Sequence, residues 1–472
     1  MRAIGLLIAL LLSSPLALAQ VRSGPAPAAE SSALALNASR LVRGVNFGNM
    51  LEAPSEGAWG LTVQESFFDR VKEAGFDHIR LPISWTHHAA RTAPYTIEPA
   101  FMARIDWCVD QALARGLKII VNVHHYDELN ADPDAERARA LSIWDQIATR
   151  MKDRPASVYF EVLNEPHGAF NEQPAKWDQF LTQALETIRR TNPARWVLVG
   201  PVRWNSIGAL EAFAPPADRR LIAAFHFYDP FEFTHQGAEW VSPSPPVGTA
   251  WNPDERGIAP PYENWSWLTT ISPAPTGLRI EYTAGWAGLQ FHRPIAKADV
   301  RRIEFRADRG MSLRLSAGVD GAMHDATVQV PAGGGVVGLD LPADKRSVQK
   351  IIIQNATNSA QPAFALSDAR VITADDRANE PLIATRREQI GLSFDRAVAW
   401  AKTKRIPLHM GEFGAYSTAD MTSRAAWTRA VREEAEKRGI AWAYWEFAAG
   451  FGVYDPTAQT WRAPLRDALV AP

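Results

Sequence analysis

From Leu41 onward the sequence alternates between short apolar runs and longer segments whose apolar residues recur with a helical period. This alternation is typical of βα units, in which parallel strands are joined by helices. Strands are expected at 41–47, 78–83, 118–123, 157–163, 196–200, 221–227, 407–413 and 441–447, and helices at 64–74, 97–115, 135–151, 174–191 and 386–404. Eight strands is the number that closes an α/β barrel of the (β/α)8 or TIM type.

The alternation is interrupted between the sixth and seventh expected strands. A structureless loop of that length inside a compact domain is improbable. The segment instead contains strand-like runs with period-two alternation, separated by glycine and proline turns, at 277–282, 302–306, 312–315, 326–330 and 350–354. These features predict an all-β sandwich over residues 265–383. It would be inserted after strand six of a barrel formed by 40–264 and 384–472.

The first residues resemble a secretory signal peptide. Met1 and Arg2 precede an apolar run that ends in small residues before Gln20, and this run is shorter than the ~20 apolar residues that a membrane span requires. We therefore expect residues 1–19 to be removed on secretion to the periplasm or the medium, leaving a chain without a membrane anchor. Residues 20–39, rich in Ala, Ser and Pro, are expected to be a linker.

The composition of the chain argues against some classes of binding partner and favours others. The formal net charge is −2, whereas a protein that binds nucleic acid or an anionic membrane usually presents a basic face. Cys108 is the single cysteine, so no disulfide can form within the chain and stability depends on a large core. The 17 Trp residues favour a sugar ligand, because aromatic rings stack on the apolar faces of sugars. We expect a monomer that binds a polysaccharide and carries no cofactor or metal.

Two carboxylates stand at strand ends that meet at the same mouth of the expected barrel. Glu165 follows strand four in Asn164-Glu165-Pro166, and Glu412 ends strand seven. Glycoside hydrolysis requires such a pair, one acting as the acid and the other as nucleophile or base. We expect the short separation of a retaining enzyme, with the pKa of Glu165 raised. Arg80 and Tyr228 would keep Glu412 ionised.

Further polar residues fall at the ends of other strands. They are Arg80 after strand two, His124 and His125 after strand three, Asn164 after strand four, His226 and Tyr228 after strand six, and Trp445 near the end of strand eight. Each has an ordinary structural explanation when taken alone. Their convergence on one face of the barrel indicates a functional site.

Several motifs resemble those of glycoside hydrolase family 5, in the clan with catalytic glutamates after strands four and seven. They are Arg80-Leu81-Pro82, Val123-His124-His125-Tyr126, Leu163-Asn164-Glu165-Pro166-His167, His226-Phe227-Tyr228, Gly411-Glu412-Phe413-Gly414 and Tyr444-Trp445-Glu446-Phe447. The resemblance implies that Glu165 is the acid/base and Glu412 the nucleophile. It also implies that Asn164 binds the sugar 2-hydroxyl. Further sugar contacts are implied for His124, His125, Asn49, Glu52 and His226, and stacking for Trp240 and Trp445.

Longer strings, such as the one from Gly48 to Pro54, resemble endoglucanases of this family that act on glucan and mannan. An endo-β-1,4-glucanase is therefore expected, with a β-mannanase or a xyloglucanase as alternatives. A metal-dependent hydrolase would require a His-x-His pair on strand one, where Asn46 and Asn49 stand instead. A non-catalytic polysaccharide-binding protein would be expected to lack a catalytic carboxylate. Aromatic residues of the insert, including Trp267 and Trp286, belong either to a sugar-binding face or to its core.

Overall fold

The computed structural model describes residues 41–259, 263–296, 300–343, 347–373 and 380–470. The expected signal peptide and linker lie outside these residues. Within the described part of the chain, no helix combines the length and the apolarity needed to span a bilayer.

Eight parallel strands form a closed barrel, as the apolar pattern predicted. Almost all of their residues are buried, because strands of a parallel barrel are covered on both faces. In barrel order they are β1 (Arg43–Asn46), β2 (His78–Leu81), β3 (Lys118–Asn122), β4 (Val158–Glu161), β5 (Val197–Val199), β6 (Leu221–His226), β20 (Leu408–Glu412) and β21 (Ala441–Tyr444). Each lies within the run expected for it, shortened by a few residues at its ends.

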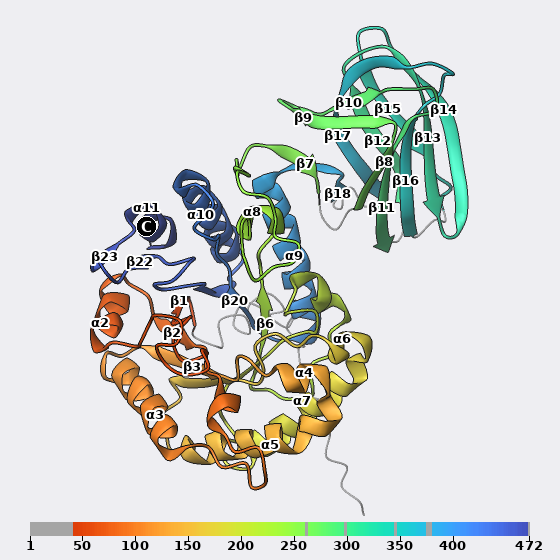
Figure 1. Ribbon diagram of the computed structural model, residues 1–472. Coiled ribbons are helices and arrows are strands. Elements are labelled where there is room, and N and C mark those ends of the chain that lie inside the picture. Colours follow the sequence, from red (N-terminus) through yellow and green to blue (C-terminus); the bar gives the residue numbers. More distant parts are fainter. Residues whose placement is uncertain (1–40, 260–262, 297–299, 344–346, 374–379, 471–472) are drawn as a thin grey trace, which may run out of the picture.

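Helices surround the barrel and pack their apolar faces on its outer surface (Figure 1). The longer ones are α2 (Glu65–Glu73), α3 (Pro99–Ala114), α5 (Pro133–Arg150), α7 (Pro174–Arg189), α9 (Arg386–Lys404), α10 (Met421–Lys437) and α11 (Ala463–Val470). All five expected helices are among them. Short elements at the strand ends are η1 (Trp85–His88), α4 (Asp127–Ala131), α6 (Ala169–Glu172), η2 (Ile207–Ala212), α8 (Phe231–Thr234) and the hairpin of β22 (Tyr454–Asp455) and β23 (Thr460–Trp461).

A β-bulge interrupts the pairing of β20 with β6. Met410 pairs with Phe225, whereas the next pair is Glu412 with His226, so Gly411 is the extra residue. Its carbonyl accepts a hydrogen bond of 3.0 Å from Asn46 Nδ2 on β1. Bulges re-aim the side chains that follow them, and this one sets Glu412 opposite His226 at the end of the barrel.

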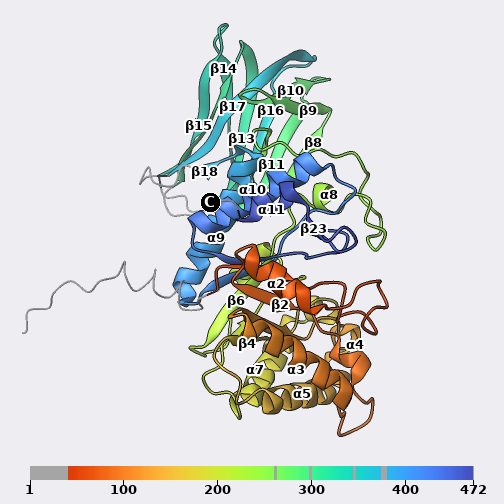
Figure 2. The same cartoon turned by 90° about the vertical axis from the view of Figure 1, so that its left-hand side faces the viewer.

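The insert is a β-sandwich of a six-stranded and a five-stranded sheet, with its own apolar core. One sheet contains β9 (Thr269–Ala274), β10 (Gly277–Tyr282), β12 (Val300–Ala307), β15 (Gly335–Asp340), β17 (Gln361–Thr373) and β18 (Glu380–Pro381). The other contains β8 (Glu263–Trp267), β11 (Gly288–Ala296), β13 (Met311–Val319), β14 (Ala322–Val330) and β16 (Ser347–Asn355). The sandwich stands beyond the side of the barrel where α9 lies (Figures 1 and 2).

A two-stranded ribbon joins the insert to the barrel. Strand β7 (Arg256–Ile258) leaves the barrel and pairs antiparallel with β19 (Ile383–Thr385), which returns to it. Thr385 then caps α9 together with Glu388 in a capping box. The expected boundary at residue 383 coincides with this ribbon, whereas the expected boundary at 265 falls inside β8.

Candidate functional site

Glu165 and Glu412 face each other at the C-terminal ends of the barrel strands. Glu165 follows β4 and Glu412 is the last residue of β20. One carboxylate oxygen of each and a ring nitrogen of His226 all lie within 4.8 Å of one another. The His226 Nδ1 atom is 2.6 Å from Glu165 Oε1 and 3.6 Å from Glu412 Oε2. The imidazole therefore lies between the two carboxylates.

Glu412 is held in its ionised form. Its Oε1 accepts a 2.7 Å hydrogen bond from Arg80 Nη1, and its Oε2 accepts one of 2.9 Å from the Tyr228 hydroxyl. Burial on its own raises the pKa of this carboxyl, but the charges of His226 and Arg80 and these hydrogen bonds outweigh burial and lower the pKa. Glu412 is thus prepared to act as an anion.

Glu165 is biased in the opposite direction. Burial raises the pKa of its carboxyl, and the nearby negative charge of Glu412 adds to the effect, while the hydrogen bond with His226 opposes it. The pKa of His226 is raised: burial lowers it, but the charge of Glu412 and the contact with Glu165 dominate. Two carboxyl groups whose pKa values are pushed apart are the usual arrangement for an acid and a nucleophile in one site.

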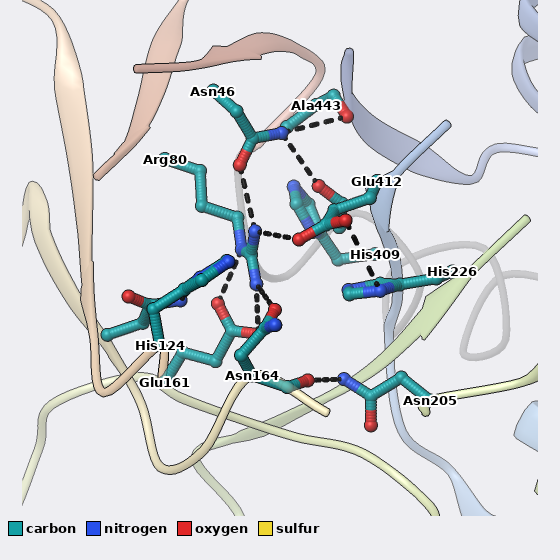
Figure 3. Close-up of polar contacts among 12 residues, drawn as sticks. Asn46, Arg80, His124, Glu161, Asn164, Asn205, His226, His409, Glu412 and Ala443 are labelled. Atoms are coloured by element: carbon teal, nitrogen blue, oxygen red, sulfur yellow. Dashed lines mark hydrogen bonds and ion pairs between the residues drawn. The ribbon is translucent and has the colours of Figure 1, made fainter. Parts of the chain in front are cut away.

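The guanidinium of Arg80 organises the floor of the site (Figure 3). It is fully buried and makes a bidentate pair with Glu161, at 2.7 and 2.9 Å. It also donates to Asn46 Oδ1 at 2.8 Å and to Asn164 Oδ1 at 2.5 Å. A single planar side chain therefore fixes four neighbours: Asn46 on β1, Glu161 on β4, Asn164 in the loop after β4, and Glu412 on β20.

Glu161 and Asn205 belong to this network, although no motif in the sequence pointed to them. Asn205 donates to the backbone carbonyl of Asn164 and so supports the loop that carries Glu165. Glu161 lies inside a strand whose residues are all buried. A carboxylate within an apolar run is rarely buried without a partner, so its position in the sequence was a usable signal for an ion pair.

His124 and Trp445 stack against each other beside Arg80. Their ring centroids are 5.4 Å apart and the rings are 7° from parallel. Burial lowers the pKa of His124 well below its ordinary value, so the ring is neutral. His125 is partly buried, and burial lowers its pKa as well. Both histidines and Trp445 thus lie where the sequence analysis expected them, at the ends of β3 and β21.

Glu52 is arranged differently from the expectation. Its carboxylate accepts hydrogen bonds from the backbone N–H groups of Asn49 and Met50, and its side chain is buried. Burial raises its pKa to about 8. Both oxygens are thus engaged by the turn after β1, which favours a structural role for Glu52 over contact with a sugar. Asn49, on the same turn, is partly exposed.

The comparisons with known proteins agree with this geometry. The sequence model of the family described as Cellulase (glycosyl hydrolase family 5) matches residues 42–255. A solved structure described as an endoglucanase is 31% identical, with a TM-score of 0.63, and the match covers 93% of this chain and 100% of that one. The chain belongs to glycoside hydrolase family 5.

Other known proteins are similar to part or most of the chain. Cel5A of Thermotoga maritima, solved with mannotriose, is 31% identical with a TM-score of 0.62, over 93% of this chain and 99% of that one. Endoglucanase H of Acetivibrio thermocellus is 41% identical over 210 residues, which cover 44% of this chain and 23% of that protein. The cellulase/esterase CelE of the same organism is 30% identical, over 40% and 26% respectively. The chain thus spans about a quarter of the length of these curated relatives.

Exposed aromatic rings lie around the site of this family 5 chain. Trp240 is 59% exposed and contacts Tyr416 edge-on at 4.9 Å between centroids. Two further rings escaped the sequence analysis: Trp59 packs edge-on against His125, and Trp204 stacks on His167 at 5.1 Å. Their signal in the sequence was weak, because a tryptophan in a loop is ordinarily expected to be buried.

The trio of Glu165, His226 and Glu412 is also the group of side chains that could approach a metal ion, among the described residues. Arg80 already places a positive charge on Glu412 at 2.7 Å, which disfavours a second cation there. His226 Nδ1 is already in contact with Glu165 Oε1 at 2.6 Å. The donor set fits proton transfer better than metal binding.

Proposed function

We propose that the protein is a retaining endo-β-1,4-glycoside hydrolase, with glucan as its substrate. The observation that carries the proposal is the pairing of Glu165 and Glu412, which have oxygens within 4.8 Å of each other and pKa shifts of opposite sign. Retaining enzymes hold their carboxyl groups about 5–5.5 Å apart, whereas inverting enzymes leave room for a water at about 6.5–9.5 Å. The short separation supports the retaining route.

In the first step Glu412 attacks the anomeric carbon from the face opposite the leaving group. Glu165 gives its proton to the glycosidic oxygen as the C–O bond breaks, and an ester links the sugar to Glu412. In the second step Glu165, now ionised, takes a proton from water while the water oxygen attacks the same carbon and releases Glu412. Two inversions restore the β configuration in the product.

Residues of the Arg80 network would position the sugar during these steps. Asn164, held by Arg80 at its Oδ1, keeps its amide N–H group for the 2-hydroxyl of the sugar at the cleavage point. His124 and Trp445 present a stacked pair on the side of Arg80. Trp240, Trp59 and Trp204 are exposed and offer further rings for units of a longer chain.

The similarity to endoglucanases favours glucan as the substrate. Mannan is the second candidate, because a similar enzyme has been solved with a mannan fragment. Cel5A of Thermotoga maritima has been solved with cellobiose and with mannotriose. A β-mannanase activity is therefore the alternative for this chain. Initial rates on cellulose derivatives, mixed-linkage glucan, xyloglucan and glucomannan, compared at equal protein concentration, would rank them.

Chemical rescue tests the two assigned roles separately. Glu412→Gly should lose cleavage of an aryl β-cellobioside, and added azide should restore turnover with an α-glycosyl azide as product. Glu165→Ala should retain the first step on a substrate with a good leaving group, and azide should give the β-glycosyl azide. The control Glu186→Gln changes an exposed carboxylate on α7 and should leave all rates unchanged. Wild-type rates in either site variant would refute the assignment.

A further inference from the structure

The two outer faces of the β-sandwich differ in chemistry. The outer face of the sheet that contains β12 carries charged side chains joined in ion pairs. Arg302 pairs with Asp340 at 2.5 Å, and Glu304 lies 3.2 Å from Arg302 and 2.7 Å from Arg370. Such a network is typical of a solvated face and gives a neutral ligand little to bind.

The outer face of the other sheet, which contains β13, carries fewer charged side chains, and among its described residues these are Arg314, Asp325 and Lys350. Strand pairing sets these side chains in rows across the sheet. One row contains Thr327, Arg314, Gln354, Gly288 and Trp267. The next row contains Asp325, Ser316, Ile352 and Gln290. The alternate residues Leu313, Leu315 and Ile353 point into the core. We call this surface the amide face; its described polar and aromatic members include Gln290, Arg314, Ser316, Asp325, Thr327, Lys350, Gln354 and Trp267.

Exposure on the amide face decreases from its edge toward its middle. Asp325 and Thr327 on the edge strand β14 are exposed, whereas Ser316 is 7% and Gln290 3% exposed. No side chain larger than that of glycine fits at Gly288, because a Cβ there would lie 2.5 Å from the ring of Trp267. The tryptophan ring thus covers the backbone at one end of the face, and small or buried groups occupy the centre.

An exposed tryptophan extends the same end of the face. Trp286 is 46% exposed, and its Nε1 donates to Asn358 Oδ1 at 2.8 Å. The backbone carbonyl of Trp286 accepts hydrogen bonds from Trp267 Nε1 at 3.2 Å and from Gln354 Nε2 at 2.7 Å. The ring is therefore held in place by hydrogen bonds at both its side chain and its backbone. A pre-positioned ring loses little entropy when a ligand stacks on it.

We propose that the amide face, together with Trp286, binds a segment of neutral β-linked polysaccharide. Arg314, Thr327 and Gln354 are at least partly exposed and can pair with sugar hydroxyls, whereas Ser316 and Gln290 are buried beneath them. The two tryptophans provide stacking surfaces. The low charge of the face supports a neutral ligand: Arg314 and Asp325 pair at 3.1 Å, and Lys350 is the remaining charged side chain among its described residues. The proposal rests on the proposed function in one respect: it takes the polymer that the barrel cleaves as the ligand.

The test uses the full chain and its mobility in native gels that contain hydroxyethylcellulose, xyloglucan or glucomannan. Trp286→Ala should weaken the apparent affinity for the retarding polymer by about tenfold, the loss expected for one stacking ring. Gln354→Ala should weaken it too, and provides a second variant if Trp286→Ala fails to fold. Arg306→Ala, which removes a side chain of the opposite charged face, is the matched control and should migrate like the wild type.

Hydrolysis of a short aryl β-cellobioside separates this proposal from the proposed function. That substrate occupies the barrel alone, so Trp286→Ala should cleave it at the wild-type rate. Should the wild type fail to cleave it, the gels still report on the amide face. Equal retardation of all variants overturns the proposal, as does the absence of retardation of the wild type. If the mass of the protein in solution rises with its concentration, and Trp286→Ala abolishes that rise, the face binds a second copy of the chain. That result would also overturn the proposal.

Discussion

Arg80 links the charge of Glu412 to the position of Asn164, so its geometry matters as much as its charge. Arg80→Lys retains a cation but replaces five donors in a plane by three on a flexible stem. We expect kcat to fall at least about 100-fold, because Glu412 and Asn164 lose their common anchor. The measurement is kcat on an aryl β-cellobioside, with urea unfolding to follow stability. Arg104→Lys, at a bidentate pair with Glu56 away from the site, is the control and should keep kcat.

The pKa shifts of the site predict a bell-shaped pH profile. Activity should rise with pH as Glu412 ionises, at a pH below its ordinary value near 4.5, and fall as Glu165 loses its proton above that value. The two limbs report on the coupled pair as a whole.

His226→Ala should move both limbs of this profile toward higher pH. The imidazole contributes a lowering effect to the pKa of each carboxyl, through the contact with Glu165 and its charge near Glu412. Values of kcat/KM between pH 3 and 9 would show the shift. Limbs that stay in place while kcat falls would mean that His226 acts only as a spacer.

At the level of single residues the sequence predicted the strand-end groups, including Arg80, and missed Glu161 and Asn205, which support them. Glu165, Glu412 and Arg80 could be located because a strand end marks the mouth of a barrel. Asn205 could not, because it supports Asn164 through a backbone carbonyl in a turn that no pattern reveals. The hydrogen bonds of Glu52 to its own turn were likewise not visible in the sequence, and its contact with a sugar stays a prediction.

At the scale of elements, the bulge in β20 connects the backbone to the chemistry. A Cβ on Gly411 would lie 3.0 Å from His226 Nε2, closer than ordinary contact distances. Gly411→Ala should therefore displace the imidazole from Glu165 and reduce kcat by about tenfold, with little change in melting temperature. Gly208→Ala is the control, since a Cβ there meets its nearest neighbour at 3.7 Å. Unchanged kcat in Gly411→Ala would show that the imidazole can adjust.

The opposite end of the barrel depends on Asp77. Its carboxylate accepts from Arg43 N at 2.9 Å and Lys118 Nζ at 2.6 Å, and lies 2.7 Å from His78 Nδ1. Although burial opposes it, the charge and hydrogen bond of His78, together with Lys118, lower the pKa of Asp77. The stabilisation is therefore present above its ordinary value near 3.8 and is lost as pH falls toward the lowered pKa.

Asp77→Asn should accordingly reduce the free energy of unfolding by about 1–3 kcal/mol at neutral pH. The difference between variant and wild type should shrink as pH falls below 4. Urea unfolding at several pH values measures both effects. A difference that is constant with pH would indicate that shape, and not charge, sets the contribution of Asp77.

The strands of the barrel could be predicted because a single pattern, the continuous apolar run, identifies each of them. The eight barrel strands are buried on both faces, so their apolar runs are continuous and easily seen. In the sandwich, β10, β12, β13, β14 and β16 were expected, whereas β8, β9, β11, β15, β17 and β18 were not. Strand β17 shows why: its buried and partly exposed positions do not alternate regularly, since its register with β12 shifts.

At the scale of the whole molecule, the ribbon of β7 and β19 makes the insert separable. Ile258 and Ile383 are register partners, so a two-residue Asn-Gly turn between them should close a hairpin in place of the sandwich. We expect the shortened chain to cleave an aryl β-cellobioside at a rate close to the wild-type rate. Loss of folding, seen by circular dichroism, would show that the barrel requires the insert.

The ribbon also affects the order in which the parts of the chain fold. Tyr228 and Glu412 are in contact yet lie 184 residues apart in the chain. Until the last two barrel strands are available, a sheet of the first six would have unpaired edges at β1 and β6, and such edges are a template for aggregation. A folded sandwich brings Glu255 and Arg386, 131 residues apart, into contact and so shortens the loop that must close. The insert can thus limit the time during which the incomplete barrel is exposed.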